Sequence, residues 1–416
     1  MDWLAAAPFA AMLLGIALLP LMIPHLWEHP AAPYALVAVC SLPVVIFAPG
    51  MHDRAELLHE LSEYLAFMAL ISALFVTAGG IHIGGNPRGT PMANATVLAI
   101  GAVAASLIGT TGASMLLIRP LLEANKERRH KTHVVVFFIL IVSNSGGLLT
   151  PLGDPPLYLG YLNGVPFSFT FRLWPAWLLA QAILLGMFLL WDSRAYARET
   201  RQALANDIAH ETPFRISGRA NILVALGIIA CSASGIPSPW RELTYLALIG
   251  LSLAFTPREV REANTFHYGP LKEVAILFFG IFVTMGPALR YLEKIAPSLP
   301  VDSAVGLFFL SGGLSSVLDN APTYLLFASL AAARAGLGTD LGALAAHQPL
   351  LLEAISVGSV FMGANTYIGN GPNLLVKAVA EGAGDARVAM PNFLAYAGWA
   401  IALLTPVYLG VVWLMF

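Results

Sequence analysis

The sequence predicts an all-α polytopic membrane protein, and three observations support that fold class. Of the 416 residues, 57% are hydrophobic and only 11% are charged, whereas a soluble domain carries about 25% charged residues. Apolar runs of about 18 to 25 residues, long enough for a helix to cross a bilayer, recur along the whole chain. The mean hydropathy is +0.74. This composition leaves no room for a sizeable soluble domain, and the net charge of −2 gives no indication of nucleic-acid binding.

The apolar segments divide into ten expected spans and two segments that are interrupted at their centres. The spans are expected at about 8–27, 30–48, 63–84, 133–165, 171–191, 218–236, 241–256, 271–290, 350–381 and 391–414. The interrupted segments are about 91–122, broken at Gly109-Thr110-Thr111-Gly112, and about 301–335, broken at Asp319-Asn320-Ala321-Pro322. Each is long enough for two short helical arms, so we expect two re-entrant hairpins.

The two halves of the chain match when one is shifted by about 210 positions. The pairs, in order along the chain, are Glu63 with Glu273, Thr77 with Thr284, Gly109 with Asp319, and Gly153-Asp154-Pro155-Pro156 with Gly369-Asn370-Gly371-Pro372. Each repeat then holds five crossings and one hairpin, and because five is odd the second repeat enters from the opposite side. Such inverted-topology repeats are typical of secondary transporters. We expect a first repeat over 1–191, a linker over 192–217 and a second repeat over 218–416.

The charges in the loops predict the orientation. Lys and Arg cluster in 119–131, 192–219 and 257–272, while the opposite loops, near 161–170 and 236–241, are nearly free of them. The positive-inside rule then places the three basic loops, linker included, in the cytoplasm and both termini in the periplasm of a bacterial inner-membrane protein. The N-terminus lacks the basic region of a cleavable signal, so we expect a retained helix. Cys40 and Cys231 lie in separate apolar segments and are expected to be buried free thiols.

Two stretches predict broken helices at membrane depth. The first is Ser143–Tyr158, SNSGGLLTPLGDPPLY, and the second is Gly363–Asn373, GANTYIGNGPN. Glycine and proline in this density do not suit a continuous helix. In hydrocarbon, irregular backbone persists only where protein or a water-filled cavity satisfies its polar groups. An acid in such a break, here Asp154, therefore indicates a functional site.

The chemistry of these breaks allows two kinds of ligand. Bare carbonyls together with Asn, Thr, Ser and Asp oxygens form a hard-oxygen cage suited to Na⁺. The bare N–H ends of half-helices suit an anion instead. Asp154 and Asp319 favour the cation, because a carboxylate binds Na⁺ when ionised and a proton when neutral, which is sufficient for exchange. The alternative is that each acid only caps the helix that follows it.

The motifs also resemble a known superfamily. SNSGGLLTPLGDPP, VLDNAPT and GANTYIGNGPN are similar to the ion-transporter superfamily of NhaD-type Na⁺/H⁺ antiporters, arsenite carriers, citrate/metal carriers and divalent-anion/Na⁺ symporters. The patterns SN-x-GG-x-x-x-P-x-GD and D-N-x-P are closest to the NhaD type, although the Asp154-Pro155-Pro156 continuation departs from it. The Ser-Asn-Thr hairpin tips of the dicarboxylate carriers are absent. The resemblance spans both repeats and implies a homodimer in which a scaffold holds a moving transport unit, with functional positions at Asn144, Asp154, Asp319 and Asn320.

The prediction is therefore a Na⁺/H⁺ antiporter of the inner membrane that works by alternating access, without a cofactor and without enzymatic activity. The expected Na⁺ ligands are Asp154, Asp319, Asn144 and Asn320. Further neutral oxygens are expected from Thr150, Thr323, Asn365, Thr366 and Asn370. The expected supporting residues are Thr110, Thr111, Ser114, Ser143, Ser145, Gly153 and Lys377.

The main alternative is a Na⁺- or H⁺-coupled carrier for citrate or another small carboxylate. It requires positive charge near the site, for which Lys377 and Arg119 are the candidates. A channel is disfavoured because a pore needs a continuous lining, and no metal triad, HExxH motif or paired nucleophile and base indicates an enzyme. Structural roles are expected for Glu63 and Glu273, which lie at helix starts, and for His82 and His133, which lie near helix ends.

Overall fold

The computed structural model describes residues 3–27, 29–47, 51–298 and 303–416. The elements of the first half are α1 (Trp3–Met22), α2 (Pro24–Trp27), α3 (Ala32–Ile46), α4 (Met51–Gly79), β1 (His82–Asn86), α5 (Pro91–Ile108), α6 (Thr110–Ala124), α7 (Thr132–Ile141), α8 (Pro155–Leu162), α9 (Trp174–Tyr196), α10 (Arg201–Ala209) and β2 (Thr212–Ser217). Those of the second half are α11 (Ala220–Ala233), α12 (Trp240–Phe255), α13 (Arg258–Ala263), α14 (Gly269–Ile295), α15 (Ala304–Ser315), α16 (Asn320–Arg334), α17 (Leu341–His347), α18 (Pro349–Met362), α19 (Gly371–Glu381) and α20 (Phe393–Met415). Short 3₁₀ helices are Ser145–Leu149, Phe167–Leu173, Ala296–Ser298, Gly363–Asn365 and Gly384–Ala386.

The predicted fold class, an all-α polytopic membrane protein, is confirmed. Within the described ranges, six helices are long and apolar enough to cross a membrane: Leu57–Gly79, Pro91–Ile108, Thr132–Leu149, Phe167–Tyr196, Gly269–Ile295 and Phe393–Met415. A bent pair, Leu341–His347 with Pro349–Asn365, would make a seventh. This number is lower than the ten expected, because helix breaks divide some segments and because α3 and α11 have only 15 and 14 residues.

All four helix breaks occur where the sequence predicts them. Gly109, with φ 83°, separates α5 from α6, and residues 316–319 separate α15 from α16. A 3₁₀ turn interrupts each predicted broken helix, between α7 and α8 and between α18 and α19. Residues 301 and 302, the start of the second predicted hairpin, lie outside the described residues.

The order of elements in one half recurs in the other. In both, a long helix (α4 or α14) precedes a hairpin, a broken helix and a final helix (α9 or α20). The packing is reciprocal as well, because α6 of the first hairpin contacts α19 of the second half while α16 of the second hairpin contacts α8 of the first. A two-fold relation between two repeats produces such reciprocity.

Local sequence explains where several of these helices begin. Thr90 caps α5 by accepting a hydrogen bond from the Ala93 N–H at 3.3 Å, and Pro91 follows at the first helical position. Ser303 caps α15 through the Gly306 N–H at 3.0 Å, and Asn392 caps α20 through the Ala395 N–H at 2.9 Å. A capping oxygen followed by proline satisfies the first free N–H groups of a helix.

The span expected at 63–84 needs correction, because its helix runs over Met51–Gly79 and a strand follows it. That strand, β1, pairs antiparallel with β2, with His82 opposite Ser217 and Asn86 opposite Thr212. The ribbon was not predicted, because HIGGN contains two glycines and lacks the alternation of a strand. The segment 192–217 contains the end of α9, α10 and β2.

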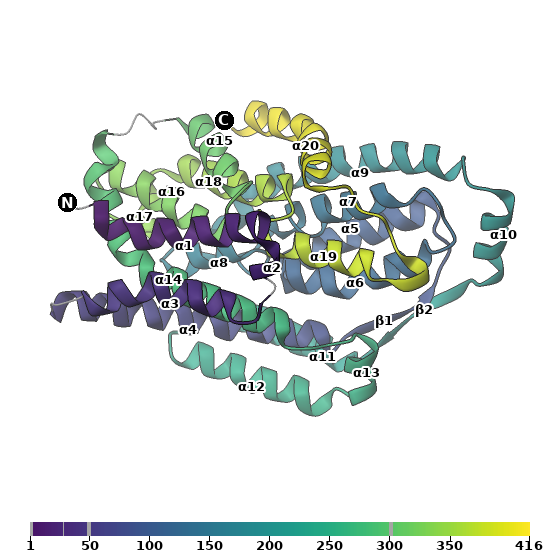
Figure 1. Cartoon of the computed structure of the whole chain (residues 1–416), viewed down its shortest axis with the longest axis horizontal. Coiled ribbons are helices and arrows are strands. Elements are labelled where there is room, and N and C mark those ends of the chain that lie inside the picture. The colour runs from purple at the N-terminus through teal and green to yellow at the C-terminus, as the bar shows by residue number, and fades with distance from the viewer. Residues whose placement is uncertain (1–2, 28, 48–50, 299–302) are drawn as a thin grey trace.

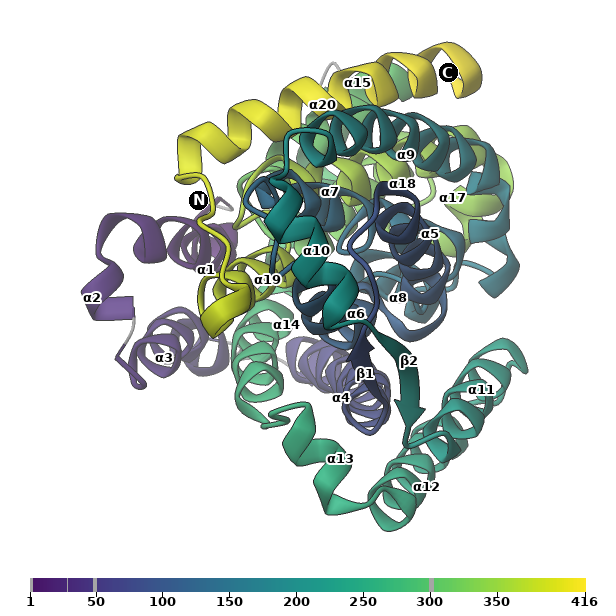
Figure 2. The ribbon, with the colours of Figure 1, turned by 90° about the vertical axis from the view of Figure 1, so that its right-hand side faces the viewer.

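Helix α7 forms the centre of the molecule. Every residue from His133 to Ile141 is buried, as expected for a helix that is apolar on all sides. It contacts α5, α9, α19 and α20. In Figures 1 and 2, α4, α11 and α12 gather on one side of the molecule, and α9, α18 and α20 lie on the other. The first helix break, at the end of α7, is therefore held inside the bundle.

Candidate functional site

Asp154 lies at the break before α8, with only 1% of its surface exposed. Its backbone is extended, and its side chain makes no capping hydrogen bond to α8, which contradicts the capping alternative. Instead, Oδ1 accepts a hydrogen bond from the Thr110 hydroxyl at 2.9 Å, and Oδ2 accepts one from Asn320 Nδ2 at 2.5 Å. Asn370 Nδ2 lies 3.5 Å from Oδ1. Three neutral donors therefore surround one buried carboxyl group.

Close backbone contact brings the first hairpin tip to this carboxyl group. The Thr110 N–H donates to the Gly153 carbonyl at 2.8 Å. Gly153 itself lies against Gly147, where an added Cβ would be 2.0 Å from the Gly147 oxygen. Gly153 is therefore a structural support of the site, because only glycine allows this approach.

The residues around Asp154 occupy equivalent positions in the two repeats. Thr110 begins α6 and Asn320 begins α16, and both donate to Asp154. Asp154 and Asn370 precede α8 and α19 in the same way. Of these four positions only one holds a carboxylate, so the charge of the site is asymmetric although the backbone pattern is repeated.

Two equivalent threonines attach the hairpins to the breaks. The Thr150 hydroxyl donates to the Ser106 carbonyl, and the Thr366 hydroxyl donates to the Ser316 carbonyl at 2.5 Å. Asn365 belongs to the same arrangement, since its Nδ2 donates to Ser316 Oγ at 2.9 Å and its Oδ1 accepts from the Tyr408 hydroxyl at 2.7 Å. Thr150, Thr366 and Asn365, three predicted sources of Na⁺-ligand oxygens, therefore hydrogen-bond other protein groups in this structure.

A network of hydrogen-bonded asparagine side chains joins the two breaks beside Asp154. Asn144 Oδ1 accepts from Asn370 Nδ2 at 3.1 Å, and Asn144 Nδ2 donates to Asn373 Oδ1 at 2.7 Å. Asn373 in turn donates to the carbonyls of Gly363 and Thr366, both at 2.9 Å. Asn373 was not selected from the sequence, although its place in GNGPN beside Asn370 could have indicated it.

Asp319 shows the capping geometry that the alternative expects. Its carboxylate accepts a hydrogen bond from the Ala321 N–H at 3.0 Å, and its carbonyl accepts one from the Thr323 hydroxyl at 2.9 Å. The side chain is partly exposed and lies near the Asp154 carboxyl group. Asp319 is therefore a helix cap placed near a second acid.

Asn320 has one unused oxygen. While its Nδ2 donates to Asp154, its Oδ1 is buried without a hydrogen-bond partner. A buried acceptor without a partner is costly, and a cation would satisfy it. This orphaned oxygen fits the predicted role of Asn320 as a ligand.

The other predicted supporting residues lie around the first break. Ser114 Oγ and Ser143 Oγ are 2.8 Å apart. Ser145 donates to the Leu140 carbonyl at 2.8 Å and accepts from Gln181 at 3.1 Å. Thr111 and Thr110 line a small cavity of about 60 Å³. This cavity lies between the hairpin tip and helices α4 and α14. That volume corresponds to about two water molecules.

The two basic residues considered for an anion are engaged elsewhere. Lys377 Nζ donates to Glu381 at 2.7 Å and lies over the Tyr367 ring. Arg119 is exposed and donates to the Thr265 hydroxyl at 2.6 Å. In the described residues, no group of three or more His, Cys, Asp or Glu side chains could hold a metal ion.

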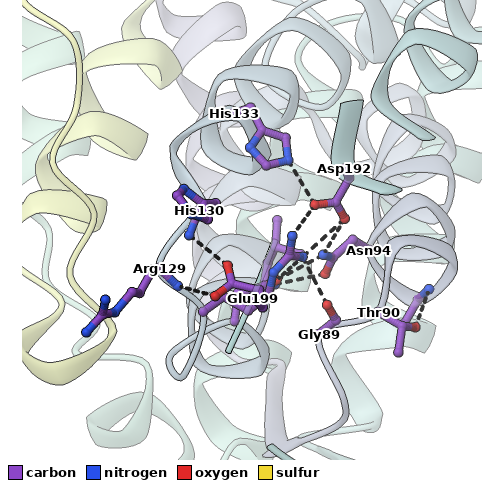
Figure 3. A network of polar contacts seen from close by, with 12 residues as sticks. Gly89, Thr90, Asn94, Arg129, His130, His133, Asp192 and Glu199 are labelled. Atoms are coloured by element: carbon purple, nitrogen blue, oxygen red, sulfur yellow. Dashed lines mark hydrogen bonds and ion pairs between the residues drawn. The ribbon is translucent and has the colours of Figure 1, made fainter. Parts of the chain in front are cut away.

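A buried ionic cluster, which the sequence analysis missed, lies at the far end of α9. Asp192 accepts hydrogen bonds from Arg128, from Asn94 at 3.1 Å and from His133 at 2.8 Å (Figure 3). Arg128 also donates to the Gly89 carbonyl at 3.0 Å. This cluster joins α5, α7 and α9, so His133 has a structural partner that the sequence did not predict. His82 does too, since its Nδ1 lies 2.8 Å from Asn264 Oδ1.

Comparison with known proteins places the chain in a family. Residues 1–416, the whole chain, match the CitMHS_2 family, which is described as "Putative citrate transport". No curated protein matches the chain. The family match supports the predicted relation to ion and citrate transporters, and it does not confirm the NhaD type. With its apolar helices and paired helix breaks, the chain is therefore an integral membrane transporter that belongs to the CitMHS_2 family.

Proposed function

We propose that this transporter is a Na⁺/H⁺ antiporter in which Asp154 binds the two cations in turn. The observation that carries the proposal is the single buried carboxylate at the meeting point of both hairpin tips and both breaks. An ionisable residue held at membrane depth among neutral donors marks an ion pathway.

The donors around Asp154 define how exchange would proceed. Thr110 and Asn320 stabilise the ionised carboxylate, which is the form that binds Na⁺. The free Asn320 Oδ1, the Thr110 hydroxyl and the carbonyls of the break supply neutral oxygens of the kind that Na⁺ prefers. A proton on the carboxylate removes the charge that Na⁺ needs, so binding of one cation releases the other. Movement of the two hairpin-bearing units against α4 and α14 would expose the site to each side alternately.

The surroundings of the site favour a small cation over a carboxylate. Two acids, Asp154 and Asp319, would repel an anionic substrate, and neither Lys377 nor Arg119 contacts them. The cavity at the hairpin tip holds about 60 Å³, well below the roughly 300 Å³ of pockets that hold small organic ligands.

A Na⁺- or H⁺-coupled citrate carrier is the second candidate. The family description favours it. The helix N-termini at the breaks do not add to this, because α8 begins with Pro155 and Pro156, which have no N–H, and α19 has proline at its second position. In this case Asp154 would bind the coupling ion, and citrate would bind in a more open conformation.

Transport by purified protein in liposomes, with a pH-sensitive dye inside, separates the two functions. A Na⁺ gradient is applied with and without citrate, to wild type, Asp154→Asn and the matched control Asp340→Asn. Asp340 caps α17 through the Ala343 N–H, and asparagine can keep that cap. We expect Na⁺ alone to move protons in wild type and Asp340→Asn, and not in Asp154→Asn.

Two results would contradict the proposal. Normal exchange by Asp154→Asn would remove the role of Asp154. Proton movement that begins only after citrate is added would replace antiport with citrate transport.

The proposal also places the chain in a bacterial inner membrane, as a homodimer with both termini in the periplasm. Alkaline phosphatase fused after Phe416 would then be active, and the same enzyme inserted at Arg201, in the predicted cytoplasmic segment, would be inactive. The reverse pattern would overturn the orientation. Mass measurement of the purified protein in detergent tests the dimer.

A further inference from the structure

A second and larger cavity lies at the opposite end of α9 from the first helix break. It has a volume of about 610 Å³ and is bounded by the segment that begins α7, the last turns of α9 and part of α20. Its lining includes the basic residues Arg129, His130, Lys131, Arg194 and Arg198, and none of its lining residues is acidic. The cavity is therefore strongly cationic, unlike the surroundings of Asp154.

Among the described residues, the acids near this cavity form no ion pair with Arg129, Arg194 or Arg198, although Glu127 and Glu199 lie close enough to act on Lys131. Asp192 is buried and binds Arg128 and His133. The Glu199 carboxylate accepts hydrogen bonds from the backbone N–H groups of Arg129, at 3.1 Å, and His130, at 2.8 Å. The backbone of Arg129 is thus fixed while its side chain points away from Glu199 (Figure 3).

Three arginines are available at the mouth of the cavity. Arg129, Arg194 and Arg198 are exposed, and none of them forms an ion pair within the part of the chain that the structure describes. Lys131 differs, because it is 7% exposed and donates to the Lys126 carbonyl at 3.1 Å. The three guanidinium groups therefore provide positive charge that no described carboxylate satisfies.

The character of the cavity changes along α9. Met187, Leu190 and Arg194 line the same cavity at a spacing of three or four residues, so they lie on one face of α9. Arg198, which also lines the cavity, lies in the turn that follows the helix. From Met187 to Arg194 the helix rises about 10 Å. Trp399 and Leu403 of α20 also line the cavity, and the Trp399 ring lies 5.5 Å from that of Trp191. One end of the cavity is thus apolar and the other is cationic, with tryptophan between them.

We propose that this cavity binds an anionic phospholipid of the surrounding membrane. The phosphate group binds Arg129, Arg194 and Arg198, and an acyl chain lies along Met187, Leu190 and Leu403. A small soluble anion would use only the cationic end, whereas a phospholipid uses both. Guanidinium groups bind phosphate through paired hydrogen bonds, and tryptophan prefers the level of the lipid headgroups. The site is separate from Asp154 and does not depend on the proposed transport reaction.

Binding of lipid to the full-length protein tests this proposal. Wild type is purified in detergent and titrated with phosphatidylglycerol, with phosphatidylcholine as the neutral lipid, and bound lipid is counted by native mass spectrometry. The test variant is Arg194→Gln with Arg198→Gln. The matched control is Arg201→Gln with Arg215→Gln, two exposed arginines that do not line the cavity. We expect the test variant to bind phosphatidylglycerol about 30-fold more weakly, from the contribution of two basic residues, and the control to bind like wild type.

Further arms of the same experiment decide what binds. Equal loss in the test and control variants, or equal binding of phosphatidylcholine, would overturn the proposal. Competition by inorganic phosphate or by citrate at the same concentration as the lipid would also overturn it, since the site would then recognise a soluble anion. The unfolding temperature of each variant without added lipid shows that the test variant is folded, and Arg129→Gln provides an independent replacement if it is not.

Discussion

Asn320 Nδ2 lies 2.5 Å from Asp154 Oδ2, although 166 positions separate the two residues in the chain. Asn320 begins a helix of the second repeat, and Asp154 ends the break of the first. Thr110, the equivalent of Asn320 in the first repeat, binds the other oxygen of the same carboxylate. The donor set around Asp154 is therefore complete only when both repeats are folded against each other.

Removal of one donor to Asp154 should weaken Na⁺ binding while folding is retained. Thr110→Val removes a hydroxyl hydrogen bond to a charged group, so the ionised form of Asp154 loses stability relative to the protonated form. We expect the KM for Na⁺ to rise about tenfold or more, and Thr110→Ser to restore it. Thr96→Val is the matched control, because the Thr96 hydroxyl only serves its own helix through the Met92 carbonyl. Equal KM values for Thr110→Val and Thr96→Val would contradict the role of Thr110.

Two variants of Asp319 separate its charge from its cap. Asparagine can still accept the Ala321 N–H, whereas alanine cannot. Asp319→Asn should therefore keep the wild-type unfolding temperature and raise the KM for Na⁺, because the second negative charge near Asp154 is lost. Asp319→Ala should also lower the free energy of unfolding by about 1 kcal/mol. If transport by Asp319→Asn equals that of wild type, Asp319 is a cap and nothing more.

The contact between Gly153 and Gly147 predicts that Gly153→Ala disrupts the first break. The new Cβ would meet the Gly147 oxygen at 2.0 Å, and such overpacking costs about 1–3 kcal/mol or more. Gly371→Ala is the control in the other break, since a Cβ at Gly371 meets no atom within 4 Å. The unfolding temperature should fall for the first variant only. A similar fall in both would show that the contact with Gly147 is not the cause, and no fall in Gly153→Ala would show that the break tolerates the contact.

Loss of the Asp192 carboxylate should destabilise the fold. Asp192→Asn leaves buried Arg128 without its charged partner, and breaking a buried pair costs about 3–5 kcal/mol. Glu381→Gln breaks the more exposed pair with Lys377, and such a pair contributes about 0–1 kcal/mol. Thermal unfolding in detergent compares the two variants, and a smaller loss for Asp192→Asn than for Glu381→Gln would refute the assignment.

Asp207 of α10 gives the stability a dependence on pH. Burial, and then the nearby Glu127 carboxylate, raise the pKa of Asp207 above its ordinary value. The folded protein therefore holds this proton more tightly than the unfolded chain, and stability falls as pH rises from the unfolded pKa of about 3.9 through the higher folded pKa. Asp207→Asn cannot ionise, so it should unfold at a higher temperature than wild type at pH 7 and at the same temperature at pH 3. A difference that is equal at both pH values would have another cause.

The parts of the fold that local chemistry determines could be predicted from the sequence. Gly109, Asp319 and the Gly/Pro-rich stretches do not suit a continuous helix, so the four breaks were recognised. Pairings between distant residues follow no local rule. Asn144 binds Asn373 across 229 positions and His133 binds Asp192 across 59, so neither partner was expected. The β1–β2 ribbon was missed for the same reason, because only its partner makes the glycine-rich β1 a strand.

The asparagine at 370, equivalent to Asp154, has an electrical consequence for the proposed exchange. A single carboxylate that carries one Na⁺ in one direction and one H⁺ in the other moves one positive charge each way. No net charge then crosses the membrane. Such a turnover is electroneutral, so the voltage across the membrane, worth about 2.3 kcal/mol per charge at 100 mV, neither drives nor opposes it. A second carboxylate at 370 would let two protons travel against one Na⁺ and would couple the cycle to that voltage. With asparagine in that place, the pH and Na⁺ gradients alone would set the direction of the proposed exchange.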